Sequence, residues 1–172
     1  AGNGILSILG QAKTGACFVG VEPDAAQCGL ARQSAALNGQ EIPFLCITAE
    51  EAPAALGHGS FTAAVMNPPY FTTGDPSHQP ARAAARHADR ALLTEFLSAA
   101  FLLLKNGGKL FVCYPADLLT DLFCALRKNR LEPKRLRPAL PNAAGAPNRV
   151  LVEAKKLGKP GLIFEPMEAG SV

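Results

Sequence analysis

An Asn-Pro-Pro-Tyr sequence, from Asn67 to Tyr70, directly follows residues 61–66, whose apolar run is typical of a strand. Pro68 and Pro69 fix their own φ angles, and Pro68 disfavours a helical conformation of Asn67, so the Asn67 amide is held in one pose. Tyr70 adds an aromatic face beside these hydrogen-bond acceptors. We therefore expect a rigid polar loop at a strand end, suited to binding an amino group on a planar ring.

The amino group of such a ring, for example adenine N6, is a poor nucleophile because its lone pair is delocalised. If the Asn67 oxygen and a carbonyl at Pro68 each accept one N–H hydrogen, the lone pair can attack an electrophilic methyl group. Positioning and preorganised dipoles give such a site several kcal/mol, and stacking on Tyr70 adds roughly 1–3 kcal/mol. The alternative is a simple turn. Ligands of open α/β sheets bind at strand carboxyl ends, which favours the catalytic interpretation.

Strand and helix patterns alternate along the rest of the chain. The predicted strands are residues 16–21, 43–47, 61–66, 110–114, 135–140 and 150–154. The predicted helices are residues 25–37, 51–56, a helix that begins at Asp89 and ends before Asn106-Gly107-Gly108, and 117–128. This alternation predicts a mainly parallel sheet covered by helices on both faces. The polar segment 71–88 is long for a loop, which favours a functional lid.

Two stretches resemble a known enzyme family. Residues 65–71, which contain Asn-Pro-Pro-Tyr, and residues 82–87, Arg-Ala-Ala-Ala-Arg-His, resemble the S-adenosylmethionine-dependent N6-adenine methyltransferases that modify tRNA(Val) beside the anticodon. The similarity continues through residues 103–111, 131–137 and 148–154, and so covers nearly the whole chain. Asn-Pro-Pro-Tyr is shared with DNA adenine, rRNA and protein-glutamine methyltransferases, so it indicates the reaction better than the substrate.

The resemblance implies an α/β, Rossmann-like class I methyltransferase fold: a doubly wound, mainly parallel sheet with an antiparallel C-terminal strand. In this family a central strand precedes the glycine turn at Gly2-Asn3-Gly4. We therefore expect a first strand that is missing ahead of Ala1. Residues 1–156 would form the catalytic domain, incomplete at its N-terminus, and residues 157–172 a C-terminal tail.

The cofactor implied by the resemblance is S-adenosylmethionine. Its expected binding residues are Gly2, Asn3, Gly4, Glu22, Pro23, Glu50 and Asn67. Glycines let the backbone approach a ligand at a helix N-terminus, although an isolated Gly-x-Gly is also common in ordinary loops. Glu22 follows a strand where such folds place an acid on the ribose hydroxyls; alternatively, it complements the positive end of the next helix. Glu50 is expected to bind the cofactor adenine, with Glu51 as the alternative.

Charge is uneven, because Lys and Arg dominate residues 127–159 whereas the preceding part is net acidic. A basic surface suits a phosphate backbone. The residues expected to contact RNA are Arg82, Arg86, His87, Arg135 and Arg149. Two alternatives remain open: the Arg127-Lys-Asn-Arg130 stretch would also suit a solvated helix end, and a lone histidine such as His87 often has a structural role.

Other features restrict the class of protein. No apolar stretch is long enough to span a membrane and no signal peptide is recognisable, so we expect a cytoplasmic protein without membrane association. The five cysteines lack metal-ligand spacing and are predicted to be reduced packing residues, with no metal. The predicted reaction is methyl transfer from S-adenosylmethionine to adenine N6 in tRNA. The alternatives are a protein glutamine N5-methyltransferase and an RNA-binding module whose cofactor site has decayed; the basic C-terminal part favours RNA.

Overall fold

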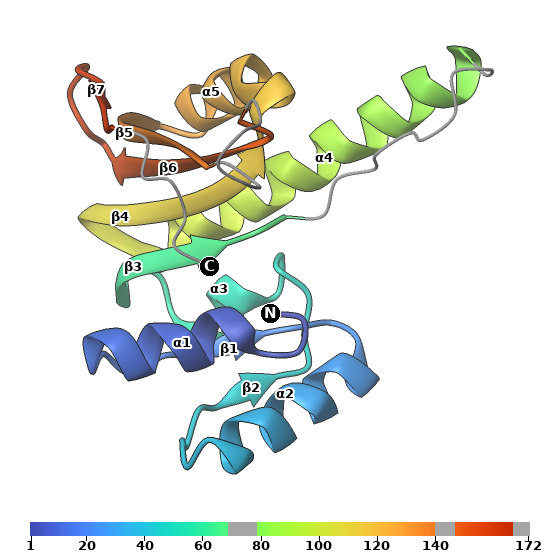
Figure 1. The fold of residues 1–172 in the computed structure, drawn as a ribbon, viewed down its shortest axis with the longest axis vertical. Helices are drawn as coiled ribbons and strands as arrows, with labels where there is room; N and C mark the ends of the chain where they lie inside the picture. The colour runs from blue at the N-terminus through green and yellow to red at the C-terminus, as the bar shows by residue number, and fades with distance from the viewer. Residues whose placement is uncertain (69–78, 140–146, 167–172) are drawn as a thin grey trace. The chain divides into compact units, whose positions relative to one another are not determined.

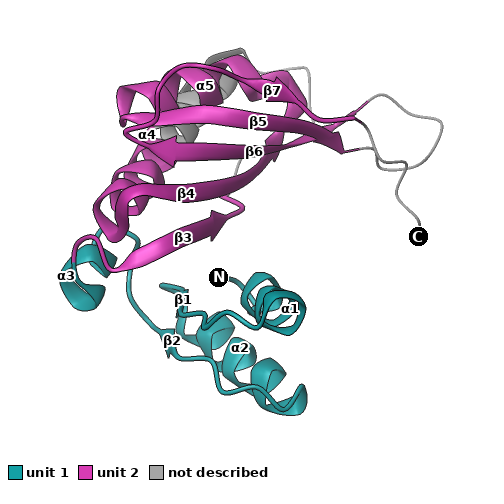
Figure 2. Ribbon diagram, turned by 90° about the vertical axis from the view of Figure 1, so that its left-hand side faces the viewer, with its two compact units in different colours: residues 1–57 teal, residues 58–172 magenta. Residues whose placement is uncertain are grey.

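A computed structural model describes residues 1–68, 79–139 and 147–166, with the side chains of 79–90 excluded. The chain forms two compact units, residues 1–57 (unit 1) and residues 58–172 (unit 2), shown in Figures 1 and 2. Both units mix helices and strands, so the predicted α/β class is confirmed.

Unit 1 contains one short pair of strands with helices. Its elements are α1 (Ile5–Thr14), β1 (Gly20–Val21), α2 (Ala25–Leu37), β2 (Phe44–Leu45) and α3 (Ala52–Leu56). Strands β1 and β2 are parallel, with Gly20 opposite Phe44. A small core forms where Ile8 of α1 and the small α2 residues Cys28 and Ala31 pack around Phe44. This core holds α1 and α2 against β2.

Helix α2 has the boundaries predicted from the sequence, because both of its ends are encoded locally. The Asp24 side chain accepts a hydrogen bond of 3.0 Å from the Gln27 backbone N–H, which caps the first turn. At the other end Gly39 has a φ of +67°, a conformation that glycine adopts without steric cost.

Unit 2 contains a five-stranded mixed sheet. Its elements are β3 (Phe61–Met66), α4 (Gln79–Leu103), β4 (Leu104–Pro115), the 3₁₀-helix η1 (Ala116–Leu118), α5 (Leu119–Lys128), β5 (Leu131–Ala139), β6 (Arg149–Lys156) and β7 (Ile163–Phe164). The strand order is β3-β4-β6-β5-β7. Strand β6 is antiparallel to both neighbours, whereas the β3–β4 and β5–β7 pairs are parallel. The predicted antiparallel strand near the C-terminus is therefore confirmed.

One face of this sheet forms the main core. In β4 the alternate residues Leu110 and Val112 are buried, while Phe111 between them is 37% exposed. The buried face packs against Leu97 of α4 and Leu126 of α5. Each fully buried side chain of this size contributes about 1.5–3 kcal/mol, so this face fixes the register of the strands.

Lys156 is buried at the end of β6 and stabilises the end of α4. Its Nζ donates hydrogen bonds to the carbonyl oxygens of Phe101 (2.6 Å) and Leu104 (2.7 Å), and lies 4.2 Å from the centre of the Phe101 ring. Carbonyls at a helix C-terminus lack partners within the helix, and a cation is favourable there. Lys156 therefore joins the end of β6 to the end of α4.

The structure corrects two predictions. Helix α4 begins at Gln79, ten residues before Asp89, so residues 79–88 are helical instead of part of a loop. Proline is tolerated in the first turn of a helix, and the alanine-rich stretch after Pro80 has high helix propensity. A lid was predicted for residues 71–88, of which residues 71–78 lie outside the described part of the chain. Cys17, Cys46 and Cys124 are exposed instead of packed. Within the predicted tail, Ile163–Phe164 forms β7.

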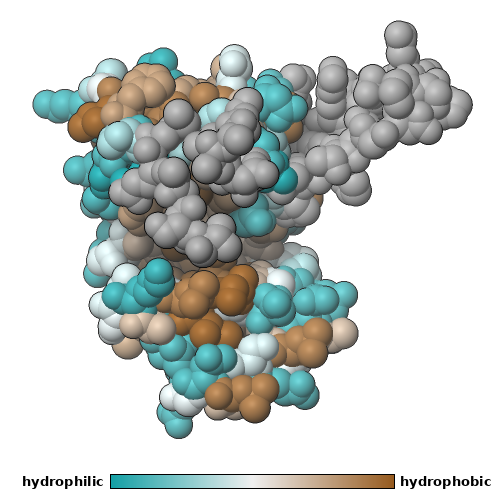
Figure 3. Space-filling view, viewed as in Figure 1, coloured by the Kyte–Doolittle hydropathy of each residue, from teal (hydrophilic) through white to brown (hydrophobic). Residues whose placement is uncertain are grey.

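Hydrophobic side chains gather on the surface of unit 1 over α1 (Figure 3), where Ile5, Leu6 and Leu9 are all more than 40% exposed. Across the described part of the chain, every helix is too short or too polar to cross a lipid bilayer.

Candidate active site

The glycine turn before α1 contains two glycines, Gly2 and Gly4, which differ in how much space surrounds them. Gly2 and Gly4 have φ values of +54° and +87°, which side chains rarely allow. A Cβ on Gly4 would lie 3.0 Å from the Phe44 ring and 3.1 Å from the Ala31 Cβ, so Gly4 is required for packing. A Cβ on Gly2 would have no heavy atom of the described residues within 4 Å. The space over Gly2 is therefore open to a ligand, whereas the space over Gly4 is filled by the core.

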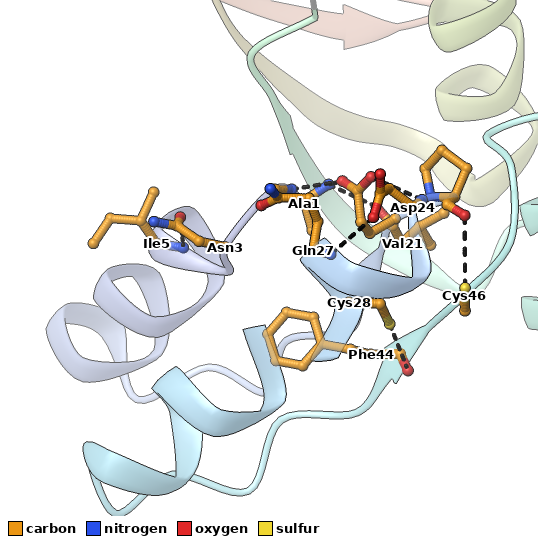
Figure 4. A network of polar contacts seen from close by, with 12 residues as sticks. Ala1, Asn3, Ile5, Val21, Asp24, Gln27, Cys28, Phe44 and Cys46 are labelled. Atoms are coloured by element: carbon orange, nitrogen blue, oxygen red, sulfur yellow. Dashed lines mark hydrogen bonds and ion pairs between the residues drawn. The ribbon is translucent and has the colours of Figure 1, made fainter. Parts of the chain in front are cut away.

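Glu22 follows β1 and binds the glycine turn through its carboxylate. Oε2 accepts hydrogen bonds from the backbone N–H of Gly2 (2.6 Å) and the amino group of Ala1 (2.9 Å). Oε1 accepts from the backbone N–H of Asp24 (3.1 Å). Figure 4 shows this network between Ala1 and the start of α2. Glu22 thus contacts both the glycine turn and the start of α2, in agreement with the alternative that it complements the positive end of that helix. Its contact with ribose hydroxyls stays a prediction.

These contacts determine the protonation of Glu22. Burial acts to raise the pKa of the carboxyl, but the hydrogen bonds that it accepts, including those from the backbone N–H groups of Gly2 and Asp24, outweigh burial, so the pKa is lowered. The side chain is only 14% exposed. A carboxylate has about four lone-pair sites. Three donors already bind the Glu22 carboxylate, so about one acceptor position remains for a ligand hydroxyl.

The neighbouring acids Glu50 and Glu51 differ in their contacts. Glu51 accepts hydrogen bonds from the Thr48 N–H (2.8 Å) and hydroxyl (3.0 Å), and its own N–H donates to Thr48 Oγ1 (3.2 Å). This reciprocal pair has the hydrogen-bond pattern of a capping box in the turn before α3, and it uses the Glu51 carboxylate. Glu50 is exposed, and its side chain has no hydrogen-bond partner within the described parts of the chain. Of the two acids, Glu50 is therefore the one available to a ligand.

The other two predicted cofactor residues of unit 1 lie beside these acids. The Asn3 Oδ1 accepts a hydrogen bond of 3.4 Å from the Ile5 N–H, at the start of α1. The Pro23 carbonyl lies between Glu22 and the α2 cap Asp24, and faces the Cys46 sulfur at 3.6 Å. Figure 4 shows both contacts. Asn3 thus contacts the start of α1, whereas Pro23 contacts the residue that follows β2.

Asn67 lies immediately after β3 in unit 2. Strand β3 is anchored by its pairing with β4, in which Met66 is opposite Val112. Asn67 is exposed, while the following Pro68 is fully buried. A buried proline ring directly after an exposed amide restricts the backbone without covering the side chain. Pro69 and Tyr70 lie outside the described residues.

The predicted RNA-contacting residues fall into two groups. Arg82, Arg86 and His87 lie in the N-terminal half of α4, where side chains are outside the description. Arg135 in β5 and Arg149 in β6 belong to the sheet. The Arg149 Nη1 donates a hydrogen bond of 3.0 Å to the Asn148 carbonyl.

Arg135 is part of an ion-pair network. Its guanidinium contacts Glu165 Oε1 at 2.7 Å and Glu153 Oε2 at 3.5 Å, and Arg137 contacts Glu165 Oε2 at 3.0 Å. Arg137 and Glu165 are not among the site residues predicted from the sequence. Arg137 had a signal, because residues two apart in a strand lie on one face. Glu165 had none, because its contact depends on the β5–β7 pairing.

The strand register shows that three arginines share a face of the sheet. Across the β5–β6 pair, Arg135 is opposite Glu153, Arg137 is opposite Leu151 and Ala139 is opposite Arg149. Alternate residues of a strand lie on the same face. Arg135, Arg137 and Arg149 therefore lie on the sheet face away from α4 and α5.

The described residues contain no group of three or more His, Cys, Asp or Glu side chains that could hold a metal ion. The candidate residues are divided between the units: the glycine turn and the acids Glu22 and Glu50 are in unit 1, and Asn67 and the arginines are in unit 2.

Sequence comparison relates the chain to tRNA methyltransferases. It is 27% identical over 154 residues to the tRNA1(Val) (adenine(37)-N6)-methyltransferase of Aeromonas hydrophila, a match that covers 88% of this chain and 64% of that protein. It is 29% identical over 135 residues to the protein of the same name from Porphyromonas gingivalis, covering 77% of this chain and 53% of the relative. The chain thus spans less than two thirds of these relatives. No family model matches it.

Solved structures establish the fold. A predicted O-methyltransferase from Agrobacterium tumefaciens superposes with a TM-score of 0.73 at 20% identity, covering 95% of this chain and 74% of the other. TrmN from Thermus thermophilus superposes with a TM-score of 0.69 at 22% identity, covering 90% of this chain and 41% of the other. The chain therefore has the Rossmann-like fold of class I methyltransferases, and the predicted resemblance to the tRNA1(Val) enzymes is confirmed.

Proposed function

We propose that the protein is a cytoplasmic S-adenosylmethionine-dependent methyltransferase that acts on the N6 amine of an adenine in tRNA, beside the anticodon. The observation that carries this proposal is the exposed Asn67 amide directly after β3, followed by the buried Pro68. Similarity to proteins named as tRNA1(Val) adenine-37 N6-methyltransferases supports the choice of base and RNA.

The residues of unit 1 fit the cofactor. The open space over Gly2 admits a ligand close to the backbone, and the ionised Glu22 beside it can accept a ribose hydroxyl. Glu50, whose carboxylate is exposed, would accept a hydrogen bond from the cofactor adenine. Asn3 and Pro23, which contact the start of α1 and the residue that follows β2, stay predicted cofactor residues. S-adenosylmethionine would supply an electrophilic methyl group on a sulfonium and would leave as the neutral thioether S-adenosylhomocysteine, while the methylated amine would lose one proton to solvent.

In this proposal Asn67 and Pro68 activate the amine without a strong base. The Asn67 side-chain oxygen accepts one N–H hydrogen of adenine N6 and the Pro68 carbonyl accepts the other. The nitrogen lone pair is then localised and directed at the methyl carbon, because both acceptors are held by a rigid backbone. Pro69 would extend the rigid loop and Tyr70 would stack on the adenine, which must be splayed out of its RNA loop to reach the site.

Product identification tests the proposal. The protein is incubated with methyl-labelled S-adenosylmethionine and, in parallel, with transcribed tRNA(Val), a peptide release factor and double-stranded DNA. We expect label in N6-methyladenine of the tRNA only. Label in glutamine of the release factor would replace the proposal with a protein methyltransferase. If calorimetry detects no S-adenosylmethionine binding and the tRNA still binds, the protein is an RNA-binding module.

A further inference from the structure

The C-terminal segment places a carboxylate on two arginines of β5. Glu165 Oε1 accepts hydrogen bonds from Arg135, with its Nε at 2.8 Å, and Oε2 contacts Arg137 at 3.0 Å. Glu165 is thereby reduced to 17% side-chain exposure, although both arginines remain at least one-third exposed. The two guanidiniums together form a fork for one anionic group.

The segment that carries Glu165 has few apolar contacts. Strand β7 contains only Ile163 and Phe164, and these side chains are 61% and 71% exposed. It is held by pairing with β5, including a hydrogen bond of 2.8 Å from the Glu165 N–H to the Leu136 carbonyl, and by the ion pairs. The preceding Leu162 packs against the main core, and Lys134 donates a hydrogen bond of 3.0 Å to the Lys159 carbonyl. Ion pairs at exposed positions are weak and are screened by salt. Another anion can therefore replace Glu165 as the partner of Arg135 and Arg137.

The same arginines have the chemistry of a phosphate site. A guanidinium presents planar N–H donors that fit carboxylate and phosphate oxygens alike. Arg149 lies on the same sheet face, and ten of the chain's 17 Lys and Arg residues fall within residues 127–172, against four of its 14 acids. Glu153 also faces Arg135, but it belongs to β6 and is shared with Lys109 at 3.1 Å. Glu165, in contrast, directly follows the two-residue strand β7.

We propose that Arg135 and Arg137 bind a backbone phosphate of RNA, and that Glu165 occupies this site in the free protein until the phosphate displaces it. The inference rests on the proposed function, in which the RNA is the tRNA substrate. Glu165 then lowers the affinity for every polyanion. An RNA that makes enough further contacts overcomes this competition, whereas a weakly bound polyanion does not.

Binding of transcribed tRNA at fixed salt tests this competition in four variants. Glu165→Gln keeps the side-chain shape and removes the charge, so we expect affinity to rise about two- to fivefold, the range of an exposed ion pair. Glu95→Gln in α4 is the matched control, because it removes the same charge and Glu95 has no ion pair within the described residues. In an Arg135→Gln/Arg137→Gln background, Glu165→Gln should have no effect, and the salt dependence should fall by about one unit per lost phosphate contact.

A fluorescent reporter gives a second readout. The chain contains no Trp, so Phe164→Trp reports on β7 alone, and its emission should change when tRNA is added. The inference is overturned if Glu165→Gln weakens tRNA binding, if it matches Glu95→Gln, or if the reporter does not respond. The outcome is separate from the proposed function: methylation assays on the same variants report the reaction, while these measurements report the occupancy of the arginine pair.

Discussion

Glu22 in unit 1 and Glu165 in unit 2 are both carboxylates whose pKa is lowered, but they are held by different donors. Glu22 accepts hydrogen bonds mainly from backbone N–H groups, at Gly2 and Asp24. Glu165 accepts from two arginine side chains. Backbone donors are fixed by the fold, whereas long side chains can reorient. In the proposed function, unit 1 would therefore bind a small cofactor at a preorganised site, and unit 2 would bind a large polyanion on an adjustable charged surface.

The largest expected effect concerns the division of roles between the two units. Asn67→Ala should lower kcat about 10²-fold or more, as removal of one transition-state hydrogen-bond partner does. Affinity for S-adenosylmethionine should be nearly unchanged, because the proposed contacts of the cofactor are mainly in unit 1. Single-turnover rates and calorimetry measure the two quantities. Asn67→Asp, which keeps an acceptor oxygen, should retain more activity than the alanine variant, and equal losses of rate and affinity would contradict this role.

The second effect compares two glycines of one turn. Gly4→Ala should lower the free energy of unfolding by about 2 kcal/mol, because it combines a strained φ with overpacking against Phe44. Gly2→Ala should cost less stability, because its Cβ enters open space, and it should instead weaken cofactor binding. Urea denaturation and calorimetry on both variants give the comparison. If the two variants lose equal stability, the space over Gly2 is not open.

The third effect tests whether the Glu22 carboxylate binds the cofactor. Glu22→Gln should weaken S-adenosylmethionine binding about tenfold, because one neutral amide oxygen replaces a charged acceptor of several hydrogen bonds. Glu41→Gln, an exposed acid of the same unit, is the control and should bind normally. Calorimetry measures the affinities, and circular dichroism checks the fold. An unchanged affinity for Glu22→Gln would mean that the carboxylate only stabilises the turn.

The smallest expected effect is a difference between Glu22 and Glu165 in how far salt raises the pKa of each carboxyl. Both folded-state pKa values lie below the ordinary 4.5, so each carboxylate stabilises its segment fully above pH 4.5 and loses this contribution as the pH falls through the lowered value. At about 1 M salt the Debye length is about 3 Å. The pKa of Glu165 should therefore rise toward 4.5 in salt, and that of Glu22 should rise less. NMR titration of the two carboxyl carbons measures this, and a larger shift at Glu22 would reverse the comparison.

Local signals predicted several elements well. Helix α2 and strand β3 have the predicted bounds, because Asp24 and Asn38-Gly39 mark the helix ends and Pro68 ends the strand. The start of α4 was predicted wrongly, because Pro80 was read as part of a loop although proline is compatible with a first helical turn. Glycine and proline are thus reliable markers only together with the residues around them.

Candidate site residues could be predicted where chemistry is local. Asn67 at a strand end and the Gly2 to Gly4 turn were recognisable from residue type and position. The choice between Glu50 and Glu51 required the structure, because the capping box that uses Glu51 depends on the backbone conformation at Thr48. The roles of the predicted site residues in binding and catalysis stay predictions until the variants are measured.

The sequence by itself determined the α/β alternation, the rigid turn after β3 and the concentration of positive charge toward the C-terminus, because each follows from neighbouring residues. Only the tertiary structure decided which charges meet. Glu165 reaches Arg135 across 30 positions of sequence through the pairing of β7 with β5. That contact depends on strand order and register, which are set by burial of the whole sheet face and are not encoded in any single segment.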